Sequence, residues 1–234
     1  MPKTLIIIPS YNESDNIIQL TEVLLKENSN TDVLVVDDSS DNTADLVSAR
    51  QATEPRLFLI KRGKKDGRGS AVLEGFKFAL SKDYERIAEM DADFSHNPHE
   101  FQSLIAVSGD NTLVIGSRYL KTSKIVGWPL TRRIFSKFAN FYANTILRIG
   151  IHDYTNGYRI YGREALKKLD VSKIKEKGYI VLSEISYQLF KNGVKIVEVP
   201  TLFVNRRRGV SNFSWKEIRE AFMSVIRIKM NSTK

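Results

Sequence analysis

The segment TLIIIPSYNE, residues 4–13, indicates how the chain folds. Its first five residues form a short, mainly apolar run, as expected for a strand buried on both faces of a sheet. Further runs of this kind alternate with segments of helical spacing. Strands are expected at residues 4–8, 32–36, 57–60, 86–90 and 112–115, and helices at 12–26, 43–52, 69–80 and from Pro98. This alternation predicts an α/β protein whose mostly parallel central sheet is flanked by helices.

Polar clusters follow three of these expected strands, at residues 10–13, 37–40 and 91–95. In a parallel sheet, ligands bind beyond the carboxyl ends of the strands. We therefore expect the three clusters to meet at one edge of the sheet and to form a binding site there.

The second half of the sequence is less regular. Helices are expected at residues 130–149, 180–191 and 214–230, with a strand at 195–199. The sequence contains no internal repeat and no convincing linker. We expect one α/β domain over residues 1–212, with an amphipathic helical extension of the same domain over residues 213–234.

The chain carries a surplus of positive charge. Among its 234 residues, 36 Lys and Arg face 27 Asp and Glu, a net charge of +9. Residues 111–152 contain seven basic side chains and no acid, interleaved with aromatic residues. This balance indicates an anionic partner: a nucleic acid, a phosphorylated small molecule or an acidic membrane surface.

Cysteine is absent, which excludes disulfides, zinc–thiolate sites and thiol nucleophiles. The first residues do not read as a signal peptide, and no apolar run approaches the length of a membrane span. We expect a cytoplasmic protein without a transmembrane segment.

Asp91-Ala92-Asp93 is the strongest cluster for chemistry. In an extended chain, residues i and i+2 point to the same side, so the two carboxylates can share one hard divalent cation. Mg²⁺ and Mn²⁺ both prefer oxygen ligands. The alternative is that the motif occurs by chance and only caps the helix at Pro98.

Two further clusters suit a nucleotide. Asp38, after the second strand, is placed to accept hydrogen bonds from a ribose or a base, while Asp41 is placed to cap the next helix. Residues 65–71, KDGRGSA, form a glycine-containing turn into a helix, which suits a phosphate but is a weak motif by itself.

Taken in order, these motifs resemble a family-2 glycosyltransferase of the GT-A fold. Residues 9–13 (PSYNE), 35–40 (VVDDSS) and 91–93 (DAD) carry the resemblance. The branch it resembles most is dolichol-phosphate or polyprenyl-phosphate mannose synthase. The motifs for this branch lie at residues 65–71, 90–98, 116–119, 127–132, 153–159, 198–200 and 206–211.

The resemblance implies roles for individual residues. The nucleotide-sugar site would comprise Pro9, Tyr11, Glu13, Val36, Asp38, Asp91, Ala92, Asp93, Arg118 and Arg206. The metal, Mg²⁺ or Mn²⁺, would be held by Asp91, Asp93 and Ser95. The acceptor phosphate would be gathered by Arg118, Arg132 and Arg206, and the catalytic residues would be Asp93, Arg118 and Arg132.

Two positions depart from the pattern of the family. Asn212 stands where lysine is usual, so a phosphate contact is missing or is supplied by Arg207 or Arg208. Asn156 stands where serine is common. We expect no membrane-spanning tail of the kind found in some branches, so the chain resembles the soluble catalytic type, which acts alone or with a membrane-protein partner.

The implied reaction is metal-dependent, inverting transfer of mannose from GDP-mannose to a dolichyl or polyprenyl phosphate at the cytoplasmic membrane face. Helices 130–149 and 214–230 would contact the membrane surface. One alternative is transfer from UDP-glucose to the same lipid. Another is transfer to a saccharide hydroxyl, with Asp153 or Glu184 as general base. A basic nucleic-acid-binding domain is a remote alternative, because the ordered carboxylates would repel phosphate, and no nucleic acid is expected as partner.

Overall fold

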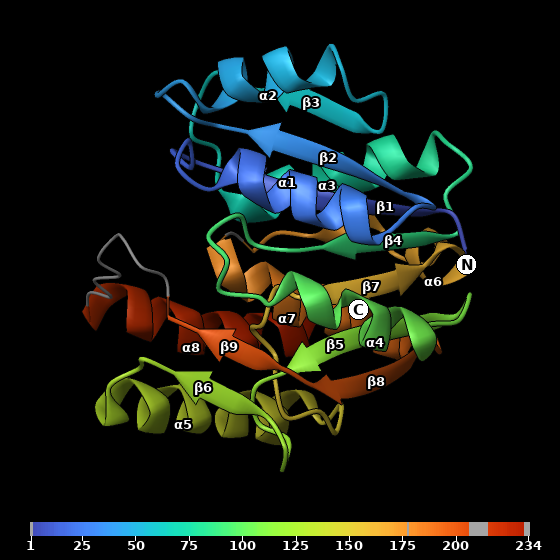
Figure 1. Cartoon of the computed structure of the whole chain (residues 1–234). Coiled ribbons are helices and arrows are strands. Elements are labelled where there is room, and N and C mark those ends of the chain that lie inside the picture. The colour runs from blue at the N-terminus through green and yellow to red at the C-terminus, as the bar shows by residue number, and fades with distance from the viewer. Residues whose placement is uncertain (1, 177, 206–214, 232–234) are drawn as a thin grey trace.

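The computed structural model describes residues 2–176, 178–205 and 215–231, with side chains in the last helix from residue 219 onward. A seven-stranded sheet in the order β3-β2-β1-β4-β7-β5-β8 forms its centre (Figure 1). The strands are β1 (Thr4–Ser10), β2 (Thr31–Asp37), β3 (Leu57–Lys61), β4 (Arg86–Glu89), β5 (Thr112–Ser117), β7 (Arg159–Gly162) and β8 (Lys195–Pro200). A separate parallel pair consists of β6 (Lys124–Val126) and β9 (Leu202–Val204).

The sheet is mostly parallel, which confirms the predicted fold class. β2 and β4 both run parallel to β1, and β8 runs parallel to β5. β7 is the exception, because it is antiparallel to both β4 and β5. The sequence pattern did not reveal β7, whose four residues are all buried and show no alternation.

The helices lie close to their expected positions. Their bounds are α1 (Ile17–Glu27), α2 (Thr43–Gln51), α3 (Arg68–Leu80), α4 (Phe101–Ala106), α5 (Leu130–Leu147), α6 (Arg163–Lys167), α7 (Val181–Lys191) and α8 (Trp215–Asn231), with 3₁₀ turns at Pro98–Glu100, Val171–Lys173 and Gly178–Ile180. The first helix was expected from residue 12 but begins at Ile17. The reason is that Asn12 has a positive φ of 56°, which ends β1 in a turn instead of a helix.

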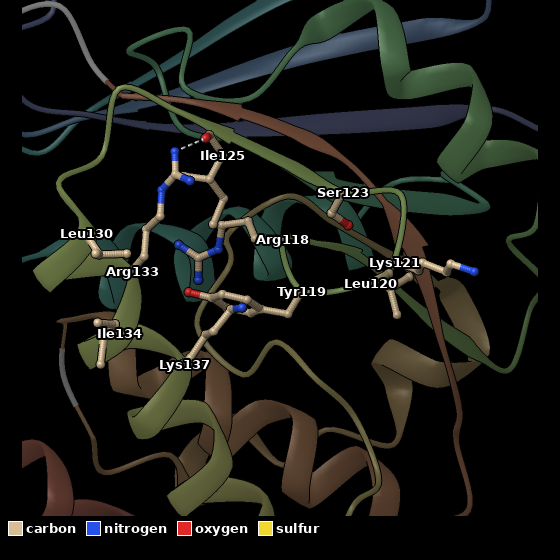
Figure 2. Close-up of a pocket in the computed structure, with 10 residues that line it drawn as sticks. All are labelled: Arg118, Tyr119, Leu120, Lys121, Ser123, Ile125, Leu130, Arg133, Ile134 and Lys137. Atoms are coloured by element: carbon tan, nitrogen blue, oxygen red, sulfur yellow. Dashed lines mark hydrogen bonds between the residues drawn. The ribbon is translucent and has the colours of Figure 1, made fainter.

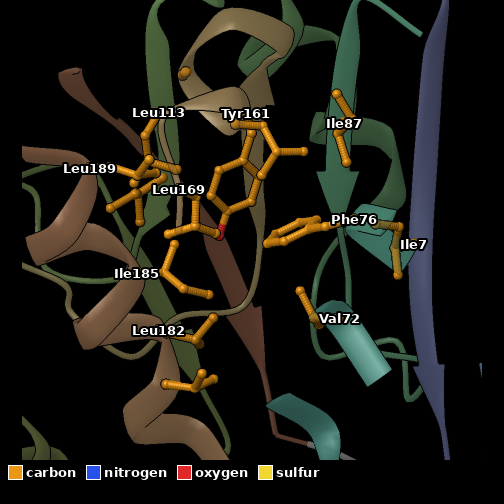
Figure 3. Close-up of a cluster of buried hydrophobic side chains, with 14 of the residues drawn as sticks. Ile7, Val72, Phe76, Ile87, Leu113, Tyr161, Leu169, Leu182, Ile185 and Leu189 are labelled. Atoms are coloured by element: carbon orange, nitrogen blue, oxygen red, sulfur yellow. The ribbon is translucent and has the colours of Figure 1, made fainter. Parts of the chain in front are cut away.

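Two apolar layers, one on each face of the sheet, form the core. Figure 3 shows the first layer, in which Phe76 of α3 and Ile185 of α7 lie near Tyr161 of β7. Gly75 lets α3 approach the sheet, since a Cβ there would lie 2.6 Å from the Ile7 side chain. The sheet is thereby fixed as a rigid support for the loops at its edge.

Helices α5 and α8 lie together at one end of the molecule (Figure 1). The Tyr142 hydroxyl donates to the Phe222 carbonyl at 3.2 Å, and the two rings meet edge to face at 4.6 Å. The expected boundary at residue 212 lies outside the described residues, so the division at that point stays a prediction. No helix in the described part of the chain has the length and hydropathy to cross a membrane.

Candidate functional site

The loops after β1 and β2 are joined by hydrogen bonds. The Asp38 N–H donates to the Ser10 carbonyl at 3.0 Å, and the Asn12 N–H donates to Ser39 Oγ at 2.7 Å. The Ser40 N–H returns a bond to Asn12 Oδ1 at 2.9 Å. Two of the three predicted polar clusters therefore form one structure at the carboxyl edge of the sheet.

Asp38 is held by an arginine that the sequence did not single out. Arg62 donates from Nε and Nη2 to the two carboxylate oxygens of Asp38, each at 2.6 Å. The Asp66 N–H adds a third bond at 2.9 Å. Asp38 thus fixes the loop before α3, in addition to any contact it makes with a ligand.

The other predicted nucleotide residues differ in their exposure. Tyr11 is exposed, and the Lys65 ammonium lies 4.1 Å from its ring centroid. Glu13 is partly buried and accepts a hydrogen bond from the Asn16 side chain at 2.8 Å. Val36 and Ala92 are buried in the core, so only their backbone atoms could contact a ligand. Pro9 is also partly buried, at the end of β1.

The two carboxylates of the Asp91-Ala92-Asp93 motif follow β4, but the motif is not the extended segment that was expected, because Ala92 and Asp93 lie in a turn. Arg68 Nε donates to Asp91 Oδ1 at 2.7 Å, and the Ser95 N–H donates to Asp93 Oδ1 at 3.0 Å. Burial raises the pKa of Asp91, but the charges of Arg68 and its other neighbours lower it further, so the pKa lies below its usual value. Both side chains are partly exposed. Asp91 is therefore ionised at neutral pH.

This donor set suits a hard divalent cation. Carboxylate oxygens are the ligands that Mg²⁺ and Mn²⁺ prefer. Within the described residues, no group of three His, Cys, Asp or Glu side chains is arranged to hold a metal ion. Ser95, the third expected ligand, is only 2% exposed. Asp91 and Asp93 would therefore need further oxygen ligands from a bound molecule, as a diphosphate provides.

A buried network links the metal-site loop to the second half of the chain. The Asp91 N–H donates to His96 Nδ1 at 3.2 Å, and His96 Nε2 lies 2.9 Å from Asn156 Oδ1. This pattern assigns the neutral tautomer with its proton on Nε2. Asn156 also donates from its side chain to the Gly116 carbonyl and from its N–H to Asp153 Oδ1. Asn156 therefore joins the loop after β4 to the end of β5 and to the segment before β7.

Arg118 and Asp153 form a buried ion pair at the centre of this region. Arg118 donates from Nε and Nη2 to the two oxygens of Asp153, at 2.7 and 2.8 Å, and from its N–H at 3.0 Å. Arg118 Nη2 also donates to Thr155 Oγ1 at 2.8 Å. Burial raises the pKa of Asp153, but the Arg118 charge and the hydrogen bonds lower it further, so the pKa is held below its usual value.

Arg132 lies on the same aromatic side chain as Arg118. Its guanidinium is 4.1 Å from the Trp128 ring centroid, and that of Arg118 is 5.4 Å away. Arg132 Nη1 donates to Asn205 Oδ1 at 3.1 Å. The structure thus brings two of the three predicted phosphate-binding arginines together. The third, Arg206, lies outside the described residues, as does Asn212.

A cavity of about 490 Å³ opens beside Arg118 (Figure 2). Its lining combines basic and apolar side chains. The residues are Arg118, Tyr119, Leu120, Lys121, Ser123, Ile125, Leu130, Arg133, Ile134 and Lys137. Lys121, Arg133 and Lys137 are not among the site residues expected from the sequence. The i, i+4 spacing of Arg133 and Lys137 was the available signal, since it places both on one side of a helix.

Beside this cavity, α5 presents an apolar face to solvent. Leu130, Ile134, Phe138 and Phe141 are 70%, 59%, 56% and 70% exposed. Their spacing of three or four residues places them along one side of the helix. Leu130 and Ile134 also line the cavity, so the exposed apolar face is continuous with its wall.

Glu184, the other carboxylate considered as a general base, accepts backbone hydrogen bonds. Its oxygens lie 3.1–3.2 Å from the Lys175 nitrogen and 2.9 Å from the Glu176 nitrogen. Burial raises its pKa above the usual value. Through these hydrogen bonds, Glu184 stabilises the turn before α7.

Comparison with known proteins agrees with this architecture. The model of the family described as glycosyl transferase family 2 matches residues 5–170. A polyprenol monophosphomannose synthase of Mycolicibacterium smegmatis is 41% identical over 226 residues, covering 95% of this chain and 85% of that protein. An undecaprenyl-phosphate mannosyltransferase of Micrococcus luteus is 37% identical, covering 96% and 93%.

Solved structures confirm the GT-A fold. The crystal structure of glucosyl-3-phosphoglycerate synthase from Mycobacterium tuberculosis with Mn²⁺, UDP-glucose and phosphoglyceric acid has a TM-score of 0.67 and 17% sequence identity. It covers 98% of this chain and 79% of that one. A second structure of the same enzyme, with Mn²⁺, UDP and glucosyl-3-phosphoglycerate, has a TM-score of 0.65, with coverage of 97% and 78%.

Proposed function

Because the chain belongs to glycosyl transferase family 2, we propose that it transfers mannose from GDP-mannose to a polyprenyl or dolichyl phosphate at the cytoplasmic face of a membrane. The names of two relatives support a mannosyl group and a polyprenyl phosphate acceptor. The observation that carries the proposal is the cavity, because its basic lining continues into the exposed apolar face of α5. A phosphate joined to a long hydrocarbon matches both surfaces.

The nucleophile in this reaction is an oxygen of the lipid phosphate. It attacks the anomeric carbon of mannose, and the bond from that carbon to the GDP oxygen breaks, with its electron pair leaving on GDP. The products are the mannosyl phospholipid and GDP. In-line attack on an α-linked donor inverts the configuration and gives a β-linked product. A phosphate monoester is mostly ionised at neutral pH, so it needs positioning rather than a general base.

The described residues divide this task. Arg118, fixed by Asp153, with Arg133 and Lys137, binds the acceptor phosphate and offsets its repulsion from the donor diphosphate. Arg132 lies on Trp128 at the side of this site. The loops that carry Tyr11 and Asp38 hold the nucleotide, together with Pro9, Glu13, Val36 and Ala92, and with Arg206, which lies outside the described residues. Positioning both reactants in this way can lower the activation barrier by roughly 7–11 kcal/mol relative to reactants that meet freely in solution.

A divalent cation, Mg²⁺ or Mn²⁺, is part of the proposal, with Asp91 and Asp93 as its ligands and Ser95 beside them. When bound, it would neutralise charge on the departing diphosphate. Mn²⁺ in the related fold supports this assignment. Asp91 and Arg118 also influence each other electrostatically, which supports a donor site adjacent to the acceptor site.

The acceptor lipid stays in its bilayer, so the enzyme is proposed to bind the membrane surface. The apolar side chains of α5 would enter the interface, while Lys121 and Lys124 would contact anionic headgroups. Phe141, 70% exposed, is the side chain that gains most from this contact. Helix α8 packs against α5 and would stabilise it there.

Transfer to a saccharide hydroxyl is less well supported. That reaction needs a general base with a free oxygen. Both oxygens of Asp153 accept hydrogen bonds from Arg118, and Glu184 accepts them from the turn before α7. These contacts favour a phosphate acceptor.

A panel of donors tests the proposal. The purified protein is incubated with Mn²⁺ or Mg²⁺, a short polyprenyl phosphate, and either GDP-mannose or UDP-glucose, and the lipid product is identified by mass. We expect a mannosyl phospholipid from GDP-mannose only. A glucosyl product from UDP-glucose, with none from GDP-mannose, would refute the proposed donor.

A further inference from the structure

Arg68 occupies one oxygen of the carboxylate that the proposed metal site needs. Its Nε donates to Asp91 Oδ1 at 2.7 Å, and its Nη1 donates to Glu89 Oε2 at 3.0 Å. The guanidinium is itself largely buried, with 10% of the side chain exposed. A permanent positive charge therefore lies in contact with Asp91.

The surroundings of Arg68 hold its guanidinium in this place. Glu89 is fully buried, and its other oxygen accepts from the Tyr161 hydroxyl at 2.6 Å. On the opposite side, Arg68 Nη2 donates to the Gly157 carbonyl at 3.3 Å. A Cβ on Gly157 would lie 2.0 Å from Arg68 Nη2, so this glycine provides the space that the guanidinium fills.

The second oxygen of Asp91 is directed differently. Asp91 Oδ2 lies 3.9 Å from His96 Nε2, which already lies within hydrogen-bond distance of Asn156. The Asp91 side chain is 19% exposed. A cation bound to Asp91 would therefore share this carboxylate with the guanidinium of Arg68. Two positive charges on one carboxylate repel each other strongly in a partly buried site.

We propose that Arg68 is a built-in counter-cation that weakens divalent metal binding at Asp91 until a nucleotide diphosphate supplies further negative charge. This inference rests on the proposed metal site and goes beyond it, because it assigns to Arg68 the coupling between metal and nucleotide. The enzyme without nucleotide then binds metal poorly. A bound diphosphate offsets the Arg68 charge and adds oxygen ligands, so the two bind together.

Titration of the protein with Mn²⁺ alone, followed through the electron paramagnetic resonance signal of free Mn²⁺, tests this inference. Arg68→Gln removes the charge, and we expect it to bind Mn²⁺ at least tenfold more tightly than the wild type without nucleotide. Arg68→Lys keeps the charge, and its affinity should stay within about threefold of the wild type. With GDP present, the difference between Arg68→Gln and wild type should shrink.

A second variant keeps Arg68 in the protein. Gly157→Ala adds a methyl group 2.0 Å from Arg68 Nη2 and 3.1 Å from Asp91 Oδ1, so the end of the flexible arginine must move away much further than the carboxylate, and Mn²⁺ binding should tighten. If Arg68→Gln does not fold, the Mn²⁺ affinity of Gly157→Ala shows whether Arg68 opposes metal binding. Arg86→Gln is the matched control, because Arg86 pairs with Asp110 at the other end of β4, and its Mn²⁺ affinity should not change.

Two failures can be told apart. If folded Arg68→Gln or Gly157→Ala binds Mn²⁺ no more tightly than wild type, Arg68 does not oppose the metal, while the metal site itself stands. If the wild type and the variants bind no Mn²⁺ even with GDP, the proposed metal site is wrong and the inference falls with it.

Discussion

Replacing Asp153 by Asn separates a positioning role from a general-base role. The two side chains have nearly the same shape, but Asn carries no charge and has only one acceptor oxygen. In the structure, both Asp153 oxygens accept hydrogen bonds from the Arg118 side chain, at 2.7 and 2.8 Å. Asp153 is 0% exposed and Arg118 is 8% exposed. The substitution therefore leaves a buried guanidinium without its counter-ion.

The size of the effect follows from this burial. Breaking a buried ion pair by removing one partner costs about 3–5 kcal/mol of unfolding free energy. At about 2 °C per kcal/mol for a chain of this size, Tm should fall by roughly 6–10 °C. Arg118 would also lose its fixed position, so the KM for the lipid phosphate should rise while the KM for the donor changes little.

Differential scanning fluorimetry and steady-state kinetics measure both effects. Asp83→Asn is the control, since Asp83 pairs with Lys3 at 2.7 Å and both side chains are exposed, at 79% and 42%. An exposed pair contributes about 0–1 kcal/mol, so Tm should change by 2 °C or less. If Asp153→Asn kept its Tm and its lipid KM but lost kcat, Asp153 would act as a general base and the reasoning would be refuted.

Acidity gives an independent check on the same pair. The folded state lowers the pKa of Asp153 below its usual value of 3.8. The ionised carboxylate therefore makes its full contribution to the free energy of unfolding at neutral pH. This contribution is lost as the pH falls below about 4 and the carboxylate becomes protonated. The difference in Tm between the wild type and Asp153→Asn should be constant from pH 6 to 8 and should narrow in acid. A difference that stays constant down to pH 3 would contradict the ion-pair explanation.

Three other substitutions test separate parts of the structure. Phe141→Glu should reduce sedimentation with anionic vesicles at least tenfold, because an apolar side chain worth about 1.5–3 kcal/mol leaves the interface. Phe190→Glu, on the exposed surface of α7, should bind vesicles as the wild type does; equal binding by both variants would exclude α5 as the contact. Lys137→Ala should raise the KM for the lipid phosphate about tenfold, or ~1.4 kcal/mol, in kinetic assays. Lys191→Ala, at the end of α7, should leave that KM unchanged, and a change of the same size there would indicate a general charge effect. Gly162→Ala should lower the free energy of unfolding in urea by about 1–3 kcal/mol, because its Cβ would lie 2.1 and 2.2 Å from two backbone oxygens. An unchanged urea midpoint would show that the strand shifts freely there.

The sequence predicts the parallel part of the sheet well, because local patterns determine it. The residues of β1 and β2 are short apolar runs that end in polar residues, and α3 follows a glycine-containing turn. β7 could not be predicted in this way. Its place between β4 and β5 depends on antiparallel pairing with strands distant in the sequence.

The candidate site is predicted only in part, for the same reason. The motif of Asp91 and Asp93 is visible in the sequence, and so is the basic character of the segment that contains Arg118. The partner of Asp91 is not, because Arg68 precedes it by 23 residues and reaches it through space left by Gly157. The basic cavity depends on where α5 packs, which the sequence pattern does not determine.

The central claim is that a lipid phosphate is the attacking group. A comparison of two acceptors tests it most directly: farnesyl phosphate and farnesol, which share the same chain and differ in the phosphate. With GDP-mannose and Mn²⁺ present, GDP release and the mass of the lipid product are measured for each. We predict a mannosyl product from farnesyl phosphate and none from farnesol. Transfer to farnesol at a comparable rate would contradict the account.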